Sequence, residues 1–214
     1  MTAPRRALIV IDGQQEYFEG VLKIQYPPRT ESLANIVTAL EVAAAQDLPV
    51  AIVQHEMPEG SPAFVKGTPT FDLHPDIEAQ LQPSWKRVVK QYSSVFAGTD
   101  VADWLKSENV DTVTIVGYMT NNCDLASSAD AEALDLNVEI LSDATGAINL
   151  ANEAGTVSAE QLHKALMVLY HSNFAAVATT PDWTEAVKSG SALPSNNLVV
   201  SAAQGNEAVG APSA

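Results

Sequence analysis

The chain has a single cysteine, Cys123, which lies just past an apolar stretch and at the start of a small-residue segment typical of a helix. A thiol at a helix N-terminus lies near the positive end of the helix dipole, so we expect its pKa to be lowered. A carboxylate, Asp12, and an ammonium, Lys90, each end another short apolar run. A nucleophile, an acid–base group and a cation in such positions could carry out covalent catalysis. A lone cysteine is equally often a small buried apolar residue.

The elements that must position these residues alternate regularly along the chain. Apolar runs typical of buried strands are followed by segments with helical periodicity. We expect strands at residues 7–11, 50–53, 88–90, 112–116, 137–141 and 175–178, and helices at 31–46, 100–108, 123–134 and 158–170. This order predicts an α/β fold: a Rossmann-like, doubly wound, mainly parallel six-stranded sheet with helices on both faces. Ligands bind such sheets at the carboxyl ends of the strands, where all three candidate residues fall.

The length of 214 residues suits one domain. We assign residues 1–188 to this domain and residues 189–214 to a C-terminal tail rich in Ser, Ala, Asn and Gly. The tail is either weakly folded or an arm that packs on a neighbouring subunit. The segment 54–76, rich in Pro and Gly, is a long loop of the kind that is often functional.

Charge and composition exclude several classes of function. The net charge of −15 and the pI near 4.4 argue against binding to nucleic acids or anionic membranes. The first apolar stretch runs straight into Asp12 and is interpreted as a strand, not a signal peptide, so we expect a cytoplasmic protein. One cysteine excludes an internal disulfide and a site built from several thiolates.

Five segments together resemble the isochorismatase-like cysteine hydrolases, a superfamily that also includes nicotinamidases and several amidohydrolases. The resemblance covers roughly residues 6–185. It rests on five segments in this order: LIVIDGQQEYF, GSPAFVKGTP with LHP, VVKQYSSVFAGTDVADWL, VGYMTNNCDLASSADA and ILSDATGA. The resemblance implies a catalytic triad of Asp12, Lys90 and Cys123.

The same resemblance implies a mechanism. Asp12 takes the thiol proton, Lys90 holds the carboxylate and the developing charge in place, and the Cys123 thiolate attacks a carbonyl carbon. The backbone N–H groups of Met119 and Cys123 form the oxyanion hole, with a cis peptide between Tyr118 and Met119. Asp12 then protonates the leaving amine, and water hydrolyses the thioester.

Five further residues are predicted to bind the substrate. Gln14 and Tyr17 resemble pocket positions after the first strand, although Gln14 could instead brace the loop. His55 ends the second strand, and Tyr92 stands where many relatives have an arginine. Tyr118 precedes Met119 in the predicted cis peptide. Tyrosines at these positions suggest a fairly neutral, aromatic pocket.

No metal and no cofactor are expected. Asp72 and His74 are the nearest match to the metal cluster of nicotinamidases, and no second histidine follows them. We therefore expect cleavage of a C–N bond in a small carboxamide or ureide through a Cys123 thioester. Alternatives are a nicotinamidase, an isochorismatase-type vinyl-ether hydrolase, or a non-catalytic member that binds small molecules. The family further implies a homo-oligomer, either a dimer or a tetramer.

Overall fold

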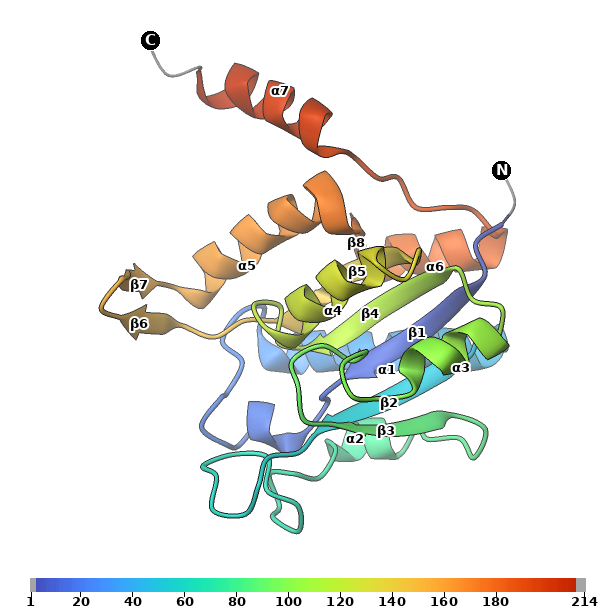
Figure 1. The fold of residues 1–214 in the computed structure, drawn as a ribbon, viewed down its shortest axis with the longest axis vertical. Helices are drawn as coiled ribbons and strands as arrows, with labels where there is room; N and C mark the ends of the chain where they lie inside the picture. The colour runs from blue at the N-terminus through green and yellow to red at the C-terminus, as the bar shows by residue number, and fades with distance from the viewer. Residues whose placement is uncertain (1–2, 211–214) are drawn as a thin grey trace.

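A computed structural model describes residues 3–210 and shows a parallel six-stranded sheet (Figure 1). The strand order is β3-β2-β1-β4-β5-β8, so the chain reverses direction across the sheet between β1 and β4. Its strands are β1 Arg6–Ile11, β2 Val50–His55, β3 Lys86–Lys90, β4 Thr112–Tyr118, β5 Asn137–Gly146 and β8 Ala176–Ala178. The predicted fold class is confirmed.

Helices cover both faces of the sheet (Figure 1). One core layer joins α1 Arg29–Ala45, α2 Pro75–Glu78 and α6 Thr180–Ser189 to one face. The other joins α3 Val101–Ser107, α4 Cys123–Glu132 and α5 Ala159–Leu169 to the opposite face. Side chains of β1 alternate between the two layers, with Leu8 in the first and Ile9 in the second. Both faces are therefore buried, which explains why β1 is apolar without interruption.

The two central strands approach each other closely at Gly117, which pairs with Ile11 in register. Gly117 has a φ of +108°, and a Cβ atom there would lie 2.0 Å from the carbonyl oxygen of Ile11. Only glycine satisfies both conditions. This contact brings the residues that follow β1 and β4 together at the carboxyl edge of the sheet.

A buried ion pair ties the opposite edge of the sheet together. Arg6 donates from its Nε and a terminal nitrogen to both carboxylate oxygens of Glu139, at 2.8–3.1 Å, and both side chains are buried. Thr114 also donates to Glu139, at 2.8 Å, and accepts the indole N–H of Trp183. The network links β1, β4, β5 and α6, and Arg6 also donates to the carbonyl of Ser191 in the tail at 2.6 Å.

Several elements differ from the sequence prediction. Short segments carry too little periodicity to be recognised, which applies to α2, to the 170–174 π-helical turn and to the β6–β7 hairpin at Leu150–Asn152 and Gly155–Val157. Helix α6 was also missed, although Thr179 caps it and Gly190 ends it in a left-handed conformation. All four expected helices, α1, α3, α4 and α5, end one to two residues earlier than predicted.

The tail contains a regular helix, so the alternative of a weakly folded tail does not describe it. Residues 198–209 form helix α7, Leu198–Val209, capped by the Asn197 side chain. None of its residues is buried, and the helix stands apart from the sheet (Figure 1). The predicted packing on a neighbouring subunit stays a prediction, and residues 211–214 lie outside the described part. No helix within residues 3–210 is long and apolar enough to cross a bilayer.

We predict that Glu139→Ala lowers the free energy of unfolding by about 3–5 kcal/mol, because it leaves the buried Arg6 guanidinium without its counter-ion. Urea denaturation measures this change. Glu132→Ala, at an exposed position near the end of α4, should shift the free energy of unfolding by no more than about 0.5 kcal/mol. Equal effects of the two substitutions would show that the ion pair does not hold the sheet edge together.

Candidate functional site

Asp12 follows β1 directly and is fully buried. Its backbone N–H donates to the Val53 carbonyl at 2.9 Å, which extends the parallel ladder by one residue. Its φ is +49°, in the left-handed region that aspartate tolerates better than most residues. A strained backbone conformation of this kind at a strand end is typical of functional sites.

Lys90 ends β3 and brings a buried ammonium to the same place. Its Nζ lies 2.7 Å from Asp12 Oδ2 and 3.3 Å from Cys123 Sγ. It also contacts His55 Nδ1 at 3.1 Å and the Tyr92 carbonyl at 3.2 Å. Burial opposes the charged ammonium, but the Asp12 carboxylate and the Cys123 sulfur outweigh that effect and raise the pKa of Lys90. The structure thus brings Asp12, Lys90 and Cys123 together around one cation.

Cys123 is the first residue of α4 and is almost completely buried. The expectation of a lowered thiol pKa is wrong for this structure. Burial, followed by the Asp12 carboxylate, raises the pKa of Cys123, and attraction to Lys90 only partly offsets this. The helix N-terminus does not decide the protonation state, because the sulfur is desolvated and faces an acid. The resting thiol therefore keeps its proton, and a nearby base must remove it.

Asp12 is placed to be that base. Burial raises its pKa above the ordinary value, while Lys90 and the neighbouring Cys123 thiol lower it. Its Oδ1 has no hydrogen-bond partner within residues 3–210. A buried carboxylate with an open oxygen and a raised pKa accepts a proton more readily than an exposed one.

Two backbone N–H groups beside the sulfur have no acceptor within the described residues, those of Met119 and Cys123. The peptide between Tyr118 and Met119 is cis, as the resemblance implies. The Met119 carbonyl accepts hydrogen bonds from the N–H groups of Asn122 and Asp124, and these bonds stabilise the turn before α4. Free N–H groups in a buried corner are suited to bind a developing oxyanion.

A cavity of about 330 Å³ opens beside Cys123. Of the predicted substrate-binding residues, Tyr17, His55 and Tyr92 line it, together with Met119 of the predicted oxyanion hole. Sequence reasoning did not assign the other lining residues to the pocket; these are Leu22, Met57, Phe64, Gln91, Ser93 and Asn122. The length of loop 54–76 was a signal for two of them, Met57 and Phe64. Arg, Lys, Asp and Glu are absent from the lining.

Gln14 and Tyr118 do not line this cavity. Gln14 bridges two segments: its amide nitrogen donates to the carbonyls of His55 and Phe71, and its oxygen accepts from the His55 N–H at 2.7 Å. It braces the loop, the alternative that the sequence left open. Tyr118 points into the core, where its hydroxyl lies 2.8 Å from Ser32 Oγ. Its direction follows from the strand alternation, which places it on the α1 face.

His55 contacts both the cation and the cavity wall. Burial and the Lys90 charge lower its pKa to about 4, so the ring is neutral at neutral pH. Its Nδ1 then accepts a hydrogen bond from Lys90, and its proton is on Nε2. The ring meets Phe64 edge to face, with 5.1 Å between centroids. His55 therefore helps to fix the direction of the Lys90 ammonium.

His74 has a structural role. Its Nδ1 accepts from the Asp76 N–H at 3.2 Å and caps α2. No group of three or more His, Cys, Asp or Glu side chains that could hold a metal ion occurs within residues 3–210. The absence of a metal from the working protein stays a prediction.

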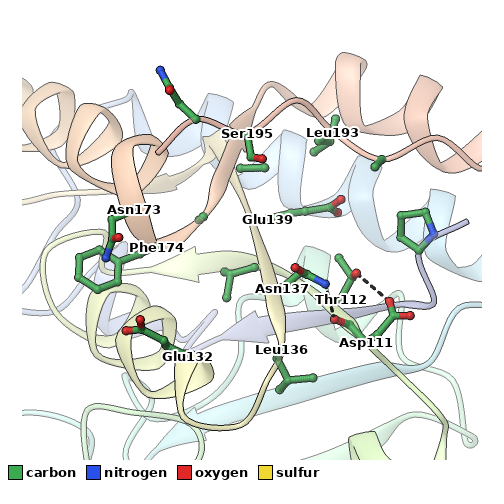
Figure 2. A pocket seen from close by; sticks show the side chains of 16 residues that line it. Asp111, Thr112, Glu132, Leu136, Asn137, Glu139, Asn173, Phe174, Leu193 and Ser195 are labelled. Atoms are coloured by element: carbon green, nitrogen blue, oxygen red, sulfur yellow. Dashed lines mark hydrogen bonds between the residues drawn. The ribbon is translucent and has the colours of Figure 1, made fainter. Parts of the chain in front are cut away.

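A second, larger cavity of about 560 Å³ lies at the amino ends of β4, β5 and β8, under the tail (Figure 2). Figure 2 shows Glu139, Asn137 and Thr112 on its floor and Ser195 on its rim. None of Asp12, Lys90 and Cys123 lines it. The smaller cavity is therefore the candidate active site, because Cys123 lines it and the Lys90 ammonium lies 3.3 Å from the Cys123 sulfur.

Comparisons with known proteins match most of the chain. Residues 6–182 match the model of the isochorismatase domain. A crystal structure of an isochorismatase-family protein from Burkholderia xenovorans superposes with a TM-score of 0.93 at 44% identity, covering 97% of this chain and 99% of that one.

Two curated relatives are similar over most of their length. The secreted isochorismatase effector Isc1 of Verticillium dahliae is 28% identical, over 82% of this chain and 88% of its own. The nicotinamidase/pyrazinamidase of Mycobacterium tuberculosis is 28% identical, over 67% of this chain and 88% of its own. The chain therefore belongs to the isochorismatase family of hydrolases.

Proposed function

We propose that this protein is a metal-independent cysteine hydrolase that cleaves a C–N bond in a small carboxamide or ureide. The observation that carries the proposal is the buried cluster of Asp12, Lys90 and Cys123, which adjoins a cavity lined by uncharged side chains. Hydrolases that use a thiol need a base, a means to stabilise the thiolate and oxyanion donors. All three have a candidate within this cluster.

The mechanism follows from the protonation states. Asp12 Oδ1 takes the proton of the neutral Cys123 thiol, and the sulfur attacks the carbonyl carbon of the substrate. Lys90 stays charged and stabilises the thiolate, while the N–H groups of Met119 and Cys123 stabilise the oxyanion. The C–N bond breaks, Asp12 returns its proton to the leaving nitrogen, and ammonia or an amine departs. Asp12 next deprotonates a water molecule, which hydrolyses the thioester and regenerates the thiol.

The chemistry of the cavity suggests the class of substrate. Its volume of about 330 Å³ suits a small molecule. Tyr17 and Phe64 pack with ring centroids 5.5 Å apart and form an aromatic wall. A substrate with two carboxylates would require cationic partners, and the lining has none. These features favour an uncharged amide over an isochorismate-like acid.

The nicotinamidase alternative is supported by relatives with that name, including the protein of Mycobacterium tuberculosis. Nicotinamide is itself a small aromatic carboxamide, so the same cysteine chemistry would apply to it. Cytoplasmic localisation stays a prediction, and one relative is a secreted effector. A homo-oligomer is likewise a prediction.

We predict that Cys123→Ala retains the fold but loses turnover by on the order of 10³-fold or more, because no other thiol is present. Ammonia release from a panel of small amides and ureides measures the loss, and mass spectrometry of the wild-type protein should detect an acyl adduct on Cys123. A fully active Cys123→Ala protein would rule out the covalent mechanism. An inactive wild type across the panel would favour the non-catalytic alternative.

We predict that Lys90→Met slows alkylation of Cys123 by iodoacetamide at least about tenfold at about pH 8, because the thiolate loses its cation. Intact-protein mass spectrometry follows the reaction without background, since the chain has one cysteine. Lys86→Met is the matched control: Lys86 begins the same strand and pairs with Asp100 at 2.8 Å. Unchanged alkylation in Lys90→Met would show that the ammonium does not stabilise the sulfur.

We predict that prolonged dialysis against EDTA leaves turnover unchanged, because the proposed steps use only protein groups. The residual metal content is measured in the same sample by elemental analysis. A loss of activity that added Zn²⁺ or Fe²⁺ restores would contradict the metal-independent mechanism and favour the nicotinamidase alternative.

A further inference from the structure

Asp124, directly after the proposed nucleophile, is fully buried and has no role in the mechanism above. Its Oδ2 is hydrogen-bonded to the Thr145 hydroxyl, and its Oδ1 has no partner within residues 3–210. An ionised carboxylate in this position would be poorly compensated, because a buried charge requires several donors or a counter-ion.

Asp124 is one end of a chain of hydrogen bonds. Thr145 Oγ1 lies 3.0 Å from Thr120 Oγ1, which lies 3.0 Å from His163 Nδ1. The other nitrogen of His163, Nε2, lies 3.0 Å from the Ser142 carbonyl. The chain therefore has four contacts and ends on a group that can only accept.

This chain of hydrogen bonds needs one more hydrogen than its two hydroxyls and a neutral histidine provide. Thr145, Thr120 and a neutral His163 supply three hydrogens for four contacts. With Asp124 ionised and His163 neutral, one of the four contacts would have no hydrogen, so two acceptor atoms would face each other. A fourth hydrogen on either Asp124 or His163 satisfies every contact.

The surroundings decide which end keeps that proton. Burial lowers the pKa of His163 to about 4, and its bond to Ser142 offsets this only in part. Burial raises the pKa of Asp124 to about 7, against the opposing effect of Thr145. The acid is therefore the better site for the proton. Its hydrogen points to Thr145, Thr145 donates to Thr120, and Thr120 donates to His163.

We propose that Asp124 holds a proton in the resting protein and donates it to Thr145, and that this proton keeps a second negative charge away from the Cys123 sulfur. Asp124 is thus a positioning residue that acts through the electrostatics of the thiol. Its functional consequence rests on the proposed role of Cys123 as nucleophile. An ionised Asp124 would raise the pKa of Cys123 further, as Asp12 already does, and would make the thiolate harder to form.

Several other groups face this site and enter its charge balance. Asp12 and Lys90 act on Asp124 with opposite signs, and Asp12 raises its pKa more than Lys90 lowers it. Three tyrosines lie within the influence of the carboxylate, and their hydroxyls stay neutral because burial raises their pKa: Tyr17, Tyr118 and Tyr170. The pKa of about 7 places the titration of Asp124 near neutral pH.

The test measures the rate of Cys123 alkylation by iodoacetamide between about pH 5.5 and about pH 9. Wild type and Asp124→Asn should react at similar rates at the low end, where Asp124 carries its proton. Above about pH 7.5 the variant should react up to about tenfold faster, the effect of one pKa unit in the thiol. Asp143→Asn is the control: this carboxylate lies on β5, the strand that carries Thr145, accepts from Thr180 and should leave the profile unchanged. Identical profiles for wild type and Asp124→Asn would overturn the proposal.

Thr145 provides a second pair of variants in case Asp124→Asn does not fold. Thr145→Val removes the one hydrogen-bond partner that the Asp124 side chain has within residues 3–210, so the pH of the inflection in the wild-type profile should change. Thr145→Ser restores the hydroxyl and should return it. A purely structural role would change the rate at all pH values without moving the inflection, which would also overturn the proposal.

Thermal stability gives an independent readout. A carboxyl pKa that is raised in the folded state means that stability falls as pH rises from about 4 through about 7, because only the unfolded chain releases the proton early. The melting temperature of Asp124→Asn, relative to that of the wild type, should therefore increase as pH rises across this window. A difference in melting temperature that does not change with pH would contradict the inference. Neither measurement needs a substrate, so an inactive protein with the expected profiles would refute the hydrolase proposal and leave this one standing.

Discussion

The arrangement of residues at the carboxyl edge of this sheet depends on a buried ion pair, in which Lys90 and Asp12 lie 2.7 Å apart. Removing two charges from water is costly, and the cost is recovered only where geometry is good and the remaining hydrogen-bonding capacity is used. Lys90 meets this condition through His55, Tyr92 and Cys123 in addition to Asp12. The pair therefore needs three strand ends, one loop carbonyl and one helix start to be in place at once.

The parallel sheet supplies these positions. Asp12 and His55 extend from neighbouring strands, and Lys90 from the next. Gly117 lets β4 come close enough to β1 for the α4 start to face Asp12. At the other end of the sheet, the Arg6–Glu139 pair fixes β1 against the outer part of the sheet. Two buried ion pairs thus hold the same strand, one at each end.

Much of this could be predicted from sequence, because apolar runs and helical periodicity report burial directly. The strands of the sheet and the meeting of Asp12, Lys90 and Cys123 belong to this part. The direction of a side chain is harder to predict, because a shift of one residue along the chain changes it. Tyr118 points into the core, and Gln14 points toward the loop. The protonation state of Cys123 could not be inferred either, because burial depends on the whole fold and here outweighs the helix terminus. Short elements such as α2 carry too few residues to show a period.

The cavity and the charge cluster share Cys123, but part of the cavity wall comes from another part of the chain. Met57 and Phe64 reach the cavity from the segment between β2 and α2, whereas Asp12, Lys90 and Cys123 come from strand ends and a helix start. An exchange of side chains in that segment can reshape the cavity without disturbing the ammonium or its partners. Side-chain changes in that one stretch of surface chain can accordingly alter selectivity in this scaffold while the reactive groups stay in place.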